Sequence, residues 1–303
     1  MSTTLGSGAD TDEREIDALV ALIRANPFPA GLEDARAALD SLGTAITDDI
    51  TIEKMDVGGV PCQMLTPPAA DENQVIVYLH GGGYALGSLH SHGGLASEIG
   101  KAAGCCVLQV DYRLAPEHKF PAPVEDSCAV YRGLISKGYD PQKISFAGDS
   151  AGGGLVVATI IALKEAGETL PGAAVCLSPW IDLEFNGESI QRCKDLDPII
   201  NMEVLGSLVG AYMAGQDLRT PTAASLYADL TGFPPLLIQV GESEVLFSDA
   251  ERLAANARKA ELDVVFEKWP EMIHVWHLFY PALTEGRTAI ARIGEFIREK
   301  TGN

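Results

Sequence analysis

Six unbroken apolar runs, separated by helical patterns, constrain the fold of this 303-residue chain more than any other feature. The runs occupy residues 75–79, 105–110, 144–147, 173–177, 236–240 and 264–269. Hydrophobicity without alternation indicates β-strands that are covered on both faces. Helical periodicity lies between and after the runs, at residues 94–103, 124–137, 151–166, 248–260 and 285–300. This order predicts a mostly parallel central sheet flanked by helices, with right-handed crossovers, which is the doubly wound α/β class.

Two helices and a hairpin are expected before the first of these strands. Amphipathic periodicity covers residues 12–26, with Asp10 or Thr11 as the candidate N-cap, and residues 32–42. A Gly-Gly pair at positions 58 and 59 has the spacing of a tight hairpin turn. The strand patterns on its two sides cover residues 50–57 and 60–65.

One stretch, residues 183–217, interrupts the alternation with a long loop that holds a single helical pattern at 203–213. Long excursions after a strand in α/β folds often cover a binding site. We therefore expect an α/β core at 46–182 and 218–303, and a helical cap made of residues 1–45 and the 183–217 insertion.

The sequence Gly-Asp-Ser-Ala-Gly at residues 148–152 carries the strongest chemical signal. It joins a strand pattern to a helix pattern, and a serine on such a tight turn is presented as an exposed nucleophile. Glycines on either side let the strand and the helix approach closely. The start of the helix also directs backbone N–H groups toward developing negative charge. Ser150 is therefore the candidate nucleophile.

Three glycines at residues 81–83 follow His80 directly after the strand at 75–79. Glycines expose backbone N–H groups that can stabilise an oxyanion. We assign this role to the N–H groups of Gly82, Gly83 and Ala151. His80 precedes the serine and is interpreted as an organiser of the glycine loop, because the base of such a site comes last in the chain.

The base is expected after the strand at 264–269, where only His274 and His277 are found. We favour His274, which lies in the loop, and expect His277 to be packed at the start of the next helix. A carboxylate must orient the imidazole, and the loop after residues 236–240 offers Glu242, Glu244 and Asp249. All three satisfy the chain order serine, acid, histidine.

Composition excludes several other classes of protein. A formal net charge of -20 disfavours binding to nucleic acid, because phosphate backbones attract clustered Lys and Arg. The first twelve residues lack the basic start and apolar run of a signal peptide. The apolar run at 155–163 falls well short of the roughly 20 residues that span a bilayer. We expect a soluble, cytoplasmic protein without stable membrane association.

Six cysteines occur without CxxC spacing and are expected to be buried thiols. A vicinal disulfide between Cys105 and Cys106 is the remote alternative, which a reducing compartment disfavours. No metal-ligand cluster or dinucleotide fingerprint is recognisable, so we expect no metal and no organic cofactor.

The sequence resembles the bacterial hormone-sensitive lipase family of carboxylesterases, in its GDSAG branch, over about residues 70–280. The resemblance rests on several blocks of sequence: His80 to Gly83, Tyr112 to Glu117 (YRLAPE), Gly148 to Gly153, Ser178-Pro179-Trp180 with Asp182, and the His274 loop. It implies an α/β-hydrolase fold and a serine esterase. Its members usually carry the triad acid in a DPL-type tripeptide, where this chain has Glu244-Val245-Leu246.

Aligning the two tripeptides puts Glu244 in the role of the triad acid and leaves Asp249 as the alternative. If Asp249 is not the acid, it is interpreted as a carboxylate that favours a helix N-terminus. The resemblance further implies that Asp149 supports the turn of Ser150. It also implies a homodimer that forms through the edge strand at 264–269.

The expected reaction is hydrolysis of small-molecule carboxylic esters with short to medium acyl chains, through a covalent acyl-enzyme. A lactone would be attacked by the same residues, so a lactone hydrolase is an alternative. A binding protein without catalysis is a second one, which the presence of both Ser150 and His274 disfavours.

Overall fold

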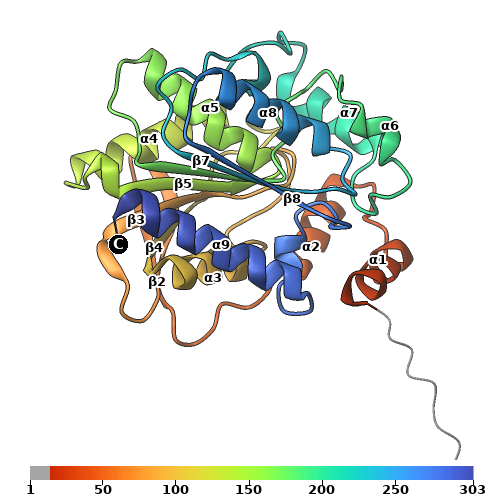
Figure 1. The fold of residues 1–303 in the computed structure, drawn as a ribbon, viewed down its shortest axis with the longest axis horizontal. Coiled ribbons are helices and arrows are strands. Elements are labelled where there is room, and N and C mark those ends of the chain that lie inside the picture. The colour runs from red at the N-terminus through yellow and green to blue at the C-terminus, as the bar shows by residue number, and fades with distance from the viewer. Residues whose placement is uncertain (1–13, 303) are drawn as a thin grey trace, which may run out of the picture.

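A computed structural model describes residues 14–302 of the chain and contains an eight-stranded sheet between two layers of helices (Figure 1). The strand order is β1-β2-β4-β3-β5-β6-β7-β8. β2 pairs antiparallel with β1 and β4, and all other neighbours are parallel. The strands are β1 (Thr51–Val57), β2 (Val60–Thr66), β3 (Asp71–Leu79), β4 (Cys105–Val110), β5 (Ile144–Asp149), β6 (Ala173–Leu177), β7 (Leu236–Gly241) and β8 (Val264–Trp269). The predicted α/β class is confirmed.

Helices cover both faces of this sheet. One face is covered by α3 (Gly93–Ala103) and α9 (Thr284–Thr301), which pack against each other. The other is covered by α4 (Ala122–Ser136), α5 (Ala151–Glu165) and α8 (Phe247–Lys259). Each face encloses its own apolar core. The interior strands β4, β5 and β6 are buried along their whole length, because helices cover both faces of the sheet.

The register of the parallel strands sets the place of the site. Leu79 of β3 pairs with Gly148 of β5, and Asp149 pairs with Leu177 of β6. The carboxyl ends of these strands therefore lie at one edge of the sheet. Loops that leave this edge are where an open α/β fold binds its ligand.

The predicted elements outside the alternation are present with adjusted bounds. The first helix is α1 (Glu15–Ala25), and the candidate caps Asp10 and Thr11 lie outside the described residues. The second is α2 (Leu32–Leu42). β3 begins at Asp71, four residues before the predicted start, because Asp71 pairs with Cys105 across an irregularity that ends at Val75.

The 183–217 insertion contains α7 (Met202–Met213) near its predicted bounds, and the short helix α6 (Ser189–Arg192) that was not predicted. Three 3-10 turns were also not predicted: η1 (Pro141–Lys143), η2 (Ser225–Tyr227) and η3 (Trp276–Phe279). Elements of three or four residues are too short to produce a periodic pattern. Among residues 14–302, no helix is both long and apolar enough to cross a membrane.

Candidate active site

Ser150 occupies the turn between β5 and α5 in a conformation that side chains rarely adopt. Its φ is 53° and its ψ is -121°, so the turn is sharp and strained. Gly152 is required here, because a Cβ at this position would lie 2.0 Å from the carbonyl oxygen of Leu79. The backbone of Ser150 is fixed on both sides: its N–H donates to Leu177 at 2.8 Å, and its carbonyl accepts from the N–H of Trp180 at 2.9 Å.

The structure brings Ser150, His274 and Glu244 together, although they come from three separate loops. Nε2 of His274 lies 2.9 Å from Oγ of Ser150. Nδ1 of the same ring lies 2.9 Å from Oε2 of Glu244. All three side chains are buried, and Ser150 retains 8% exposure. With Glu244 ionised, Nδ1–H donates to it, and Nε2 is left to accept the serine proton.

The two other carboxylates considered for the acid have different surroundings. Glu242 is exposed. Asp249 is buried in the first turn of α8, where its Oδ2 accepts the N–H groups of Ile181 and Asp182 at 2.9 Å each. Burial raises the pKa of Asp249 to about 7. This carboxyl thus anchors the chain after β6 to α8, close to its expected place at a helix N-terminus.

Burial and charge act against each other in the His274–Glu244 pair. Burial by itself lowers the pKa of His274, but the hydrogen bond and the charge of Glu244 outweigh it and raise that pKa above its ordinary value. The pKa of Glu244 is raised by burial, which its bonds from His274, Ser178 and Gly241 only partly offset. The pair is thus arranged to favour a proton on the imidazole.

The glycine loop after β3 presents unused backbone donors beside Ser150. Gly82 and Gly83 have φ angles of +112° and +63°, which glycine adopts without strain. Gly81 donates its N–H to Oδ1 of Asp149 at 3.1 Å. In the described part of the chain, no acceptor is recorded for the N–H groups of Gly82, Gly83 or Ala151. The loop therefore has donors available for a negatively charged oxygen.

Asp149 lies at the centre of a buried network behind this loop. Its Oδ1 also accepts the hydroxyl of Tyr78 at 2.7 Å, and its Oδ2 lies 3.2 Å from Nε2 of His92. Burial by itself raises the pKa of Asp149, but His92 and Tyr78 together hold it below its ordinary value. The network joins the residue before Ser150 to the glycine loop.

The other two histidines discussed from the sequence are both buried. Nδ1 of His80 lies 2.8 Å from the carbonyl oxygen of Gly81, and burial lowers its pKa to about 4. His277 lies in η3 with Nε2 2.8 Å from Oε1 of Gln239, and burial lowers its pKa to about 3. Neither contacts Ser150.

Sequence reasoning missed the residues that hold the acid in place. The hydroxyl of Ser178 donates to Oε1 of Glu244 at 2.7 Å, and the N–H of Gly241 donates to the same oxygen at 2.6 Å. Asp197, in the insertion, accepts the N–H of Val245 at 3.0 Å. Ser178 was noted only as part of a block of similarity, and its position directly after a buried strand was the signal available. No sequence pattern pointed to Asp197.

Among residues 14–302 there is no group of three or more His, Cys, Asp or Glu side chains arranged to hold a metal ion. All six cysteines lie within this range as buried free thiols, including the adjacent Cys105 and Cys106.

Comparison with known families places these features in context. The model of a family described as alpha/beta hydrolase fold matches residues 76–278. An acetyl-hydrolase of Streptomyces hygroscopicus is 47% identical over 276 residues, covering 91% of this chain and 90% of the relative. An esterase of Acinetobacter venetianus is 33% identical and covers 75% of each chain.

Solved structures agree with the sequence relatives. The crystal structure of an esterase from the bacterial hormone-sensitive lipase family superposes with a TM-score of 0.92 at 49% identity, covering 95% of this chain and 98% of that one. An esterase/lipase from an uncultured bacterium gives a TM-score of 0.92 at 40% identity, covering 95% and 99%.

Proposed function

The chain belongs to the α/β-hydrolase family, in its bacterial hormone-sensitive lipase group, and hydrolyses carboxylic esters; we propose that Ser150, His274 and Glu244 carry out this reaction. The single observation that carries the proposal is the continuous chain of contacts from the serine hydroxyl through the imidazole to the carboxylate, with both distances at 2.9 Å. A catalytic triad is recognised by the geometry and the roles of its three residues, not by their positions in the sequence.

In the first half of the reaction, His274 accepts the proton of Ser150 through Nε2 as Oγ attacks the ester carbonyl carbon. The imidazolium that forms is stabilised by Glu244, which is why a raised pKa of His274 suits a base in this position. The carbonyl oxygen becomes an oxyanion as the tetrahedral intermediate forms.

The proposed oxyanion hole consists of the N–H groups of Gly82, Gly83 and Ala151. Their free donors and their fixed backbone favour it, because preorganised donors need no rearrangement when charge develops. His274 then gives its proton to the leaving alcohol, and an acyl-enzyme on Ser150 remains. Water attacks this ester with His274 again as the base, and releases the acid.

Replacing Ser150 with Ala tests the proposal directly. The Ser150→Ala variant is expected to lose at least about 10⁴-fold in kcat on p-nitrophenyl acetate, because no acyl-enzyme can form. A fluorophosphonate should label the wild type at Ser150 and leave the variant unlabelled. Ester hydrolysis at the wild-type rate by pure, folded variant would refute the assignment.

We propose that the acyl groups are short, with acetyl among them. Two aromatic residues are joined to the site through the backbone: the N–H of Trp180 donates to the carbonyl oxygen of Ser150, and Tyr84 directly follows Gly83. The ring of Tyr84 lies 6.1 Å from that of Trp180 and 3.9 Å from that of Tyr212, and all three are buried. These buried, mutually packed rings are the basis for the proposed limit on the length of the acyl chain. The similarity to an acetyl-hydrolase supports the same preference.

A series of p-nitrophenyl esters tests this preference. The acetate and butyrate are expected to exceed the octanoate by about tenfold or more in kcat/KM, since a chain that displaces packed aromatic groups loses more than 1.4 kcal/mol. A small lactone assayed beside them separates the two reaction classes. An octanoate rate above the acetate rate would contradict the proposal.

We also propose that residues 1–45 and 183–217 act as a cap over a core formed by residues 46–182 and 218–303. Leu208 of α7 lies directly over the glycine loop, because a Cβ on Gly83 would be 2.4 Å from its side chain. Arg36 of α2 donates to the carbonyl oxygens of Ala85 and Ala115 next to that loop. These contacts from the described parts of both segments support a cap over the proposed oxyanion hole.

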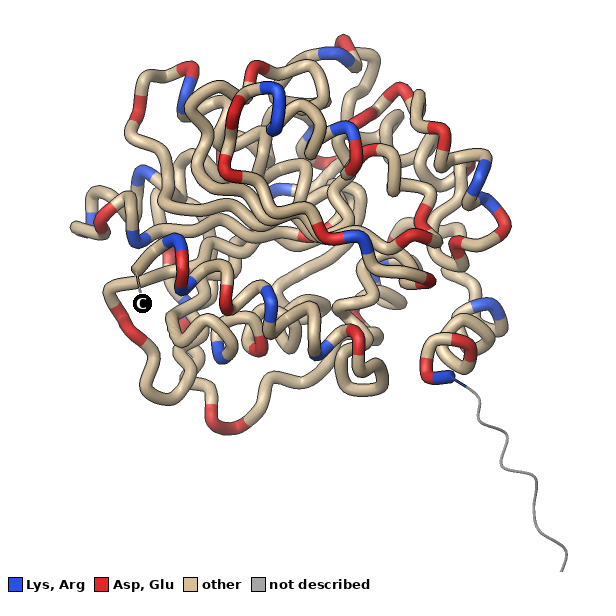
Figure 2. Tube along the Cα trace, viewed as in Figure 1, with Lys and Arg blue, Asp and Glu red and all other residues tan. Residues whose placement is uncertain are grey.

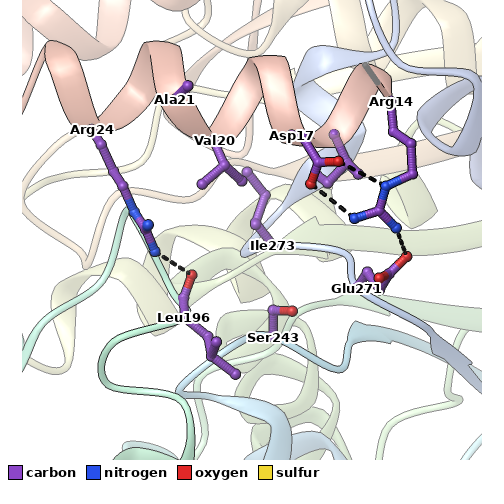
Figure 3. Close-up of a pocket in the computed structure, with 10 residues that line it drawn as sticks. Arg14, Asp17, Val20, Ala21, Arg24, Leu196, Ser243, Glu271 and Ile273 are labelled. Atoms are coloured by element: carbon purple, nitrogen blue, oxygen red, sulfur yellow. Dashed lines mark hydrogen bonds and ion pairs between the residues drawn. The ribbon is translucent and has the colours of Figure 1, made fainter. Parts of the chain in front are cut away.

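Helix α1 extends this cover to the loop of His274. Ile16 and Leu19 pack in one apolar cluster with Met272 and Ile273. Residues of α1 line a groove of about 390 Å³. Figure 3 shows Arg14, at one end of this groove, bonded to Glu271. At the other end, Arg24 donates to the backbone of Leu196 in the insertion. These contacts support a cap in which both parts are joined.

A homodimer through β8 is proposed as the assembly. β8 forms one edge of the sheet, with only β7 beside it in the described chain. Light scattering on the eluting protein should give twice the chain mass of 32.1 kDa. A mass equal to one chain would contradict the proposal.

A further inference from the structure

The segment that follows β6 contacts all three loops of the proposed triad. Leu177 and Trp180 hold the backbone of Ser150 from its two sides, through its N–H and its carbonyl. Between them, Ser178 donates its own N–H to the carbonyl of Gln239 in β7 at 2.8 Å, which extends the sheet by one residue. Its side chain is left free to reach the remaining two loops.

The Ser178 hydroxyl bridges the acid and the base. It donates its single proton to Oε1 of Glu244 at 2.7 Å and accepts the N–H of Val275, the residue after His274, at 3.1 Å. A hydroxyl has one donor and two acceptor sites, so this pattern uses it consistently. The oxygen is fully buried, with no exposure of the residue. Outside these two loops, no other side chain among residues 14–302 bonds to both of them.

From this arrangement we infer that Ser178 is a positioning residue of the catalytic site, which holds the Glu244 carboxylate and the His274 loop in the register that the triad needs. The inference rests on the proposed function and deepens it. Glu244 is one methylene longer than an aspartate, so its carboxylate needs more fixed contacts to stay in one orientation. Ser178 and Gly241 fix Oε1, and Oε2 is thereby directed at Nδ1 of His274.

The backbone of Ser178 supports the same interpretation. Its φ is 45°, in the left-handed region that glycine or asparagine adopts more readily than serine. A glycine would relieve this strain, and the hydroxyl of Ser178 supplies two hydrogen bonds that a glycine at this position could not make.

The backbone conformation also supplies a sharp test, because two substitutions remove the hydroxyl with different effects on the turn. Ser178→Ala keeps the strain, and Ser178→Gly relieves it. If the hydroxyl positions the triad, kcat on p-nitrophenyl acetate falls by about 10- to 100-fold in both variants, the range for losing one hydrogen bond to a charged group. KM is expected to stay within about twofold, since no substrate contact is removed.

Ser127→Ala is the matched control. Ser127 is equally buried, donates one hydrogen bond to the carbonyl of Pro123 within α4, and lies outside the site. Its variant should keep the wild-type kcat. Rates are expressed per site titrated with a fluorophosphonate, and assays are run well below the lowest melting temperature, so that a less stable variant is still measured in its folded form.

Each outcome decides the inference. A joint loss in kcat for the Ala and Gly variants, with unchanged KM, supports it. Wild-type kcat in both overturns it, as does a rate that Gly restores and Ala does not, because the backbone alone would then matter. Failure of the proposed function itself is separate, since it would appear as hydrolysis by Ser150→Ala.

Discussion

At the scale of single residues, the chemistry of the site depends on which groups are charged near neutral pH. His274 must be neutral to accept the proton of Ser150. Its pKa is raised by Glu244 against the effect of burial, and the charges of Asp197 and Asp149 act in the same direction as Glu244. His277 also lies nearby, but burial lowers its pKa to about 3, so it adds no charge there.

Activity should therefore show an acidic limb whose midpoint lies above pH 6.5. Below the midpoint, kcat/KM is expected to fall tenfold per pH unit, because only the neutral fraction of His274 reacts. Glu244→Gln should move this limb to lower pH by removing the neighbouring charge, and should lower kcat by at least about 100-fold. The measurement is a pH series of initial rates on p-nitrophenyl acetate from pH 5 to 9.

Asp249 requires a control in this experiment, because its pKa of about 7 lies in the same range. Asp249→Asn keeps an oxygen that can accept the N–H groups of Ile181 and Asp182 while removing the titration. The limb should persist in this variant. A limb that disappears in Asp249→Asn and stays in Glu244→Gln would show that the titrating group is Asp249 and not His274.

At the scale of elements, the insertion is bound to the loop that carries the acid. Asp197 accepts the N–H of Val245, and the hydroxyl of Ser189 donates to the carbonyl of the same residue. Ser189 and Ser248 also exchange bonds between backbone and side chain at 3.0 and 2.9 Å. The segment proposed as a cap thus holds Val245, the residue next to Glu244. We therefore expect changes in this segment to alter the catalytic rate.

Asp197→Asn tests this coupling. The amide keeps one acceptor for the N–H groups of Ile199 and Ile200, but removes the negative charge and the carboxylate acceptor opposite Val245. We expect kcat to fall by about tenfold, and the acidic limb to shift to lower pH. Asp195→Asn makes the same change of net charge two residues away, on an exposed side chain. Equal rates and equal pH profiles for the two variants would argue against the coupling.

How far the sequence could predict these elements depended on their length and burial. The buried strands and long helices were recognised because continuous or periodic hydrophobicity extends over many residues. The loop of Ser150 was recognised because a strand, a turn and a helix meet there. The bonds of Ser178 and Asp197 join segments 66 and 48 residues apart, and no local pattern encodes such a pairing. Predicting these bonds would have required knowledge of the register of the sheet and of the path of the insertion.

At the scale of the whole molecule, the sequence carries a formal net charge of -20, and the charged residues of the described part of the chain are spread over the fold rather than gathered at one place (Figure 2). Figure 2 shows Lys and Arg interspersed with the more numerous Asp and Glu around the chain. The groups that dominate the dependence of stability on pH are instead in the interior. His277 and His80 are buried and neutral, whereas Asp249 is buried with a raised pKa.

These buried groups act in opposite directions. The pKa of His277 is lowered to about 3 in the fold, against roughly 6.5 when unfolded, so its contribution is present above pH 6.5 and is lost as the pH falls toward 3. His80 behaves alike, with a folded pKa of about 4. Asp249 has a raised pKa, so its contribution is present below about pH 4 and is lost as the pH rises through 7. Comparing a variant with the wild type isolates one of these contributions.

We therefore predict that His277→Gln loses less stability on acidification than the wild type. The glutamine amide can still donate to Oε1 of Gln239 in place of Nε2–H, but it has no proton to bind. Between pH 6.5 and 5 the unfolding free energy of the variant should fall by about 1.6 kcal/mol less, because the slope approaches about 1.4 kcal/mol per pH unit only well below the unfolded pKa. Urea unfolding at several pH values measures this. His90→Gln makes the same substitution on an exposed side chain and is the matched control. Parallel curves for His277→Gln and wild type would mean that His277 binds its proton equally well in the folded and unfolded chains.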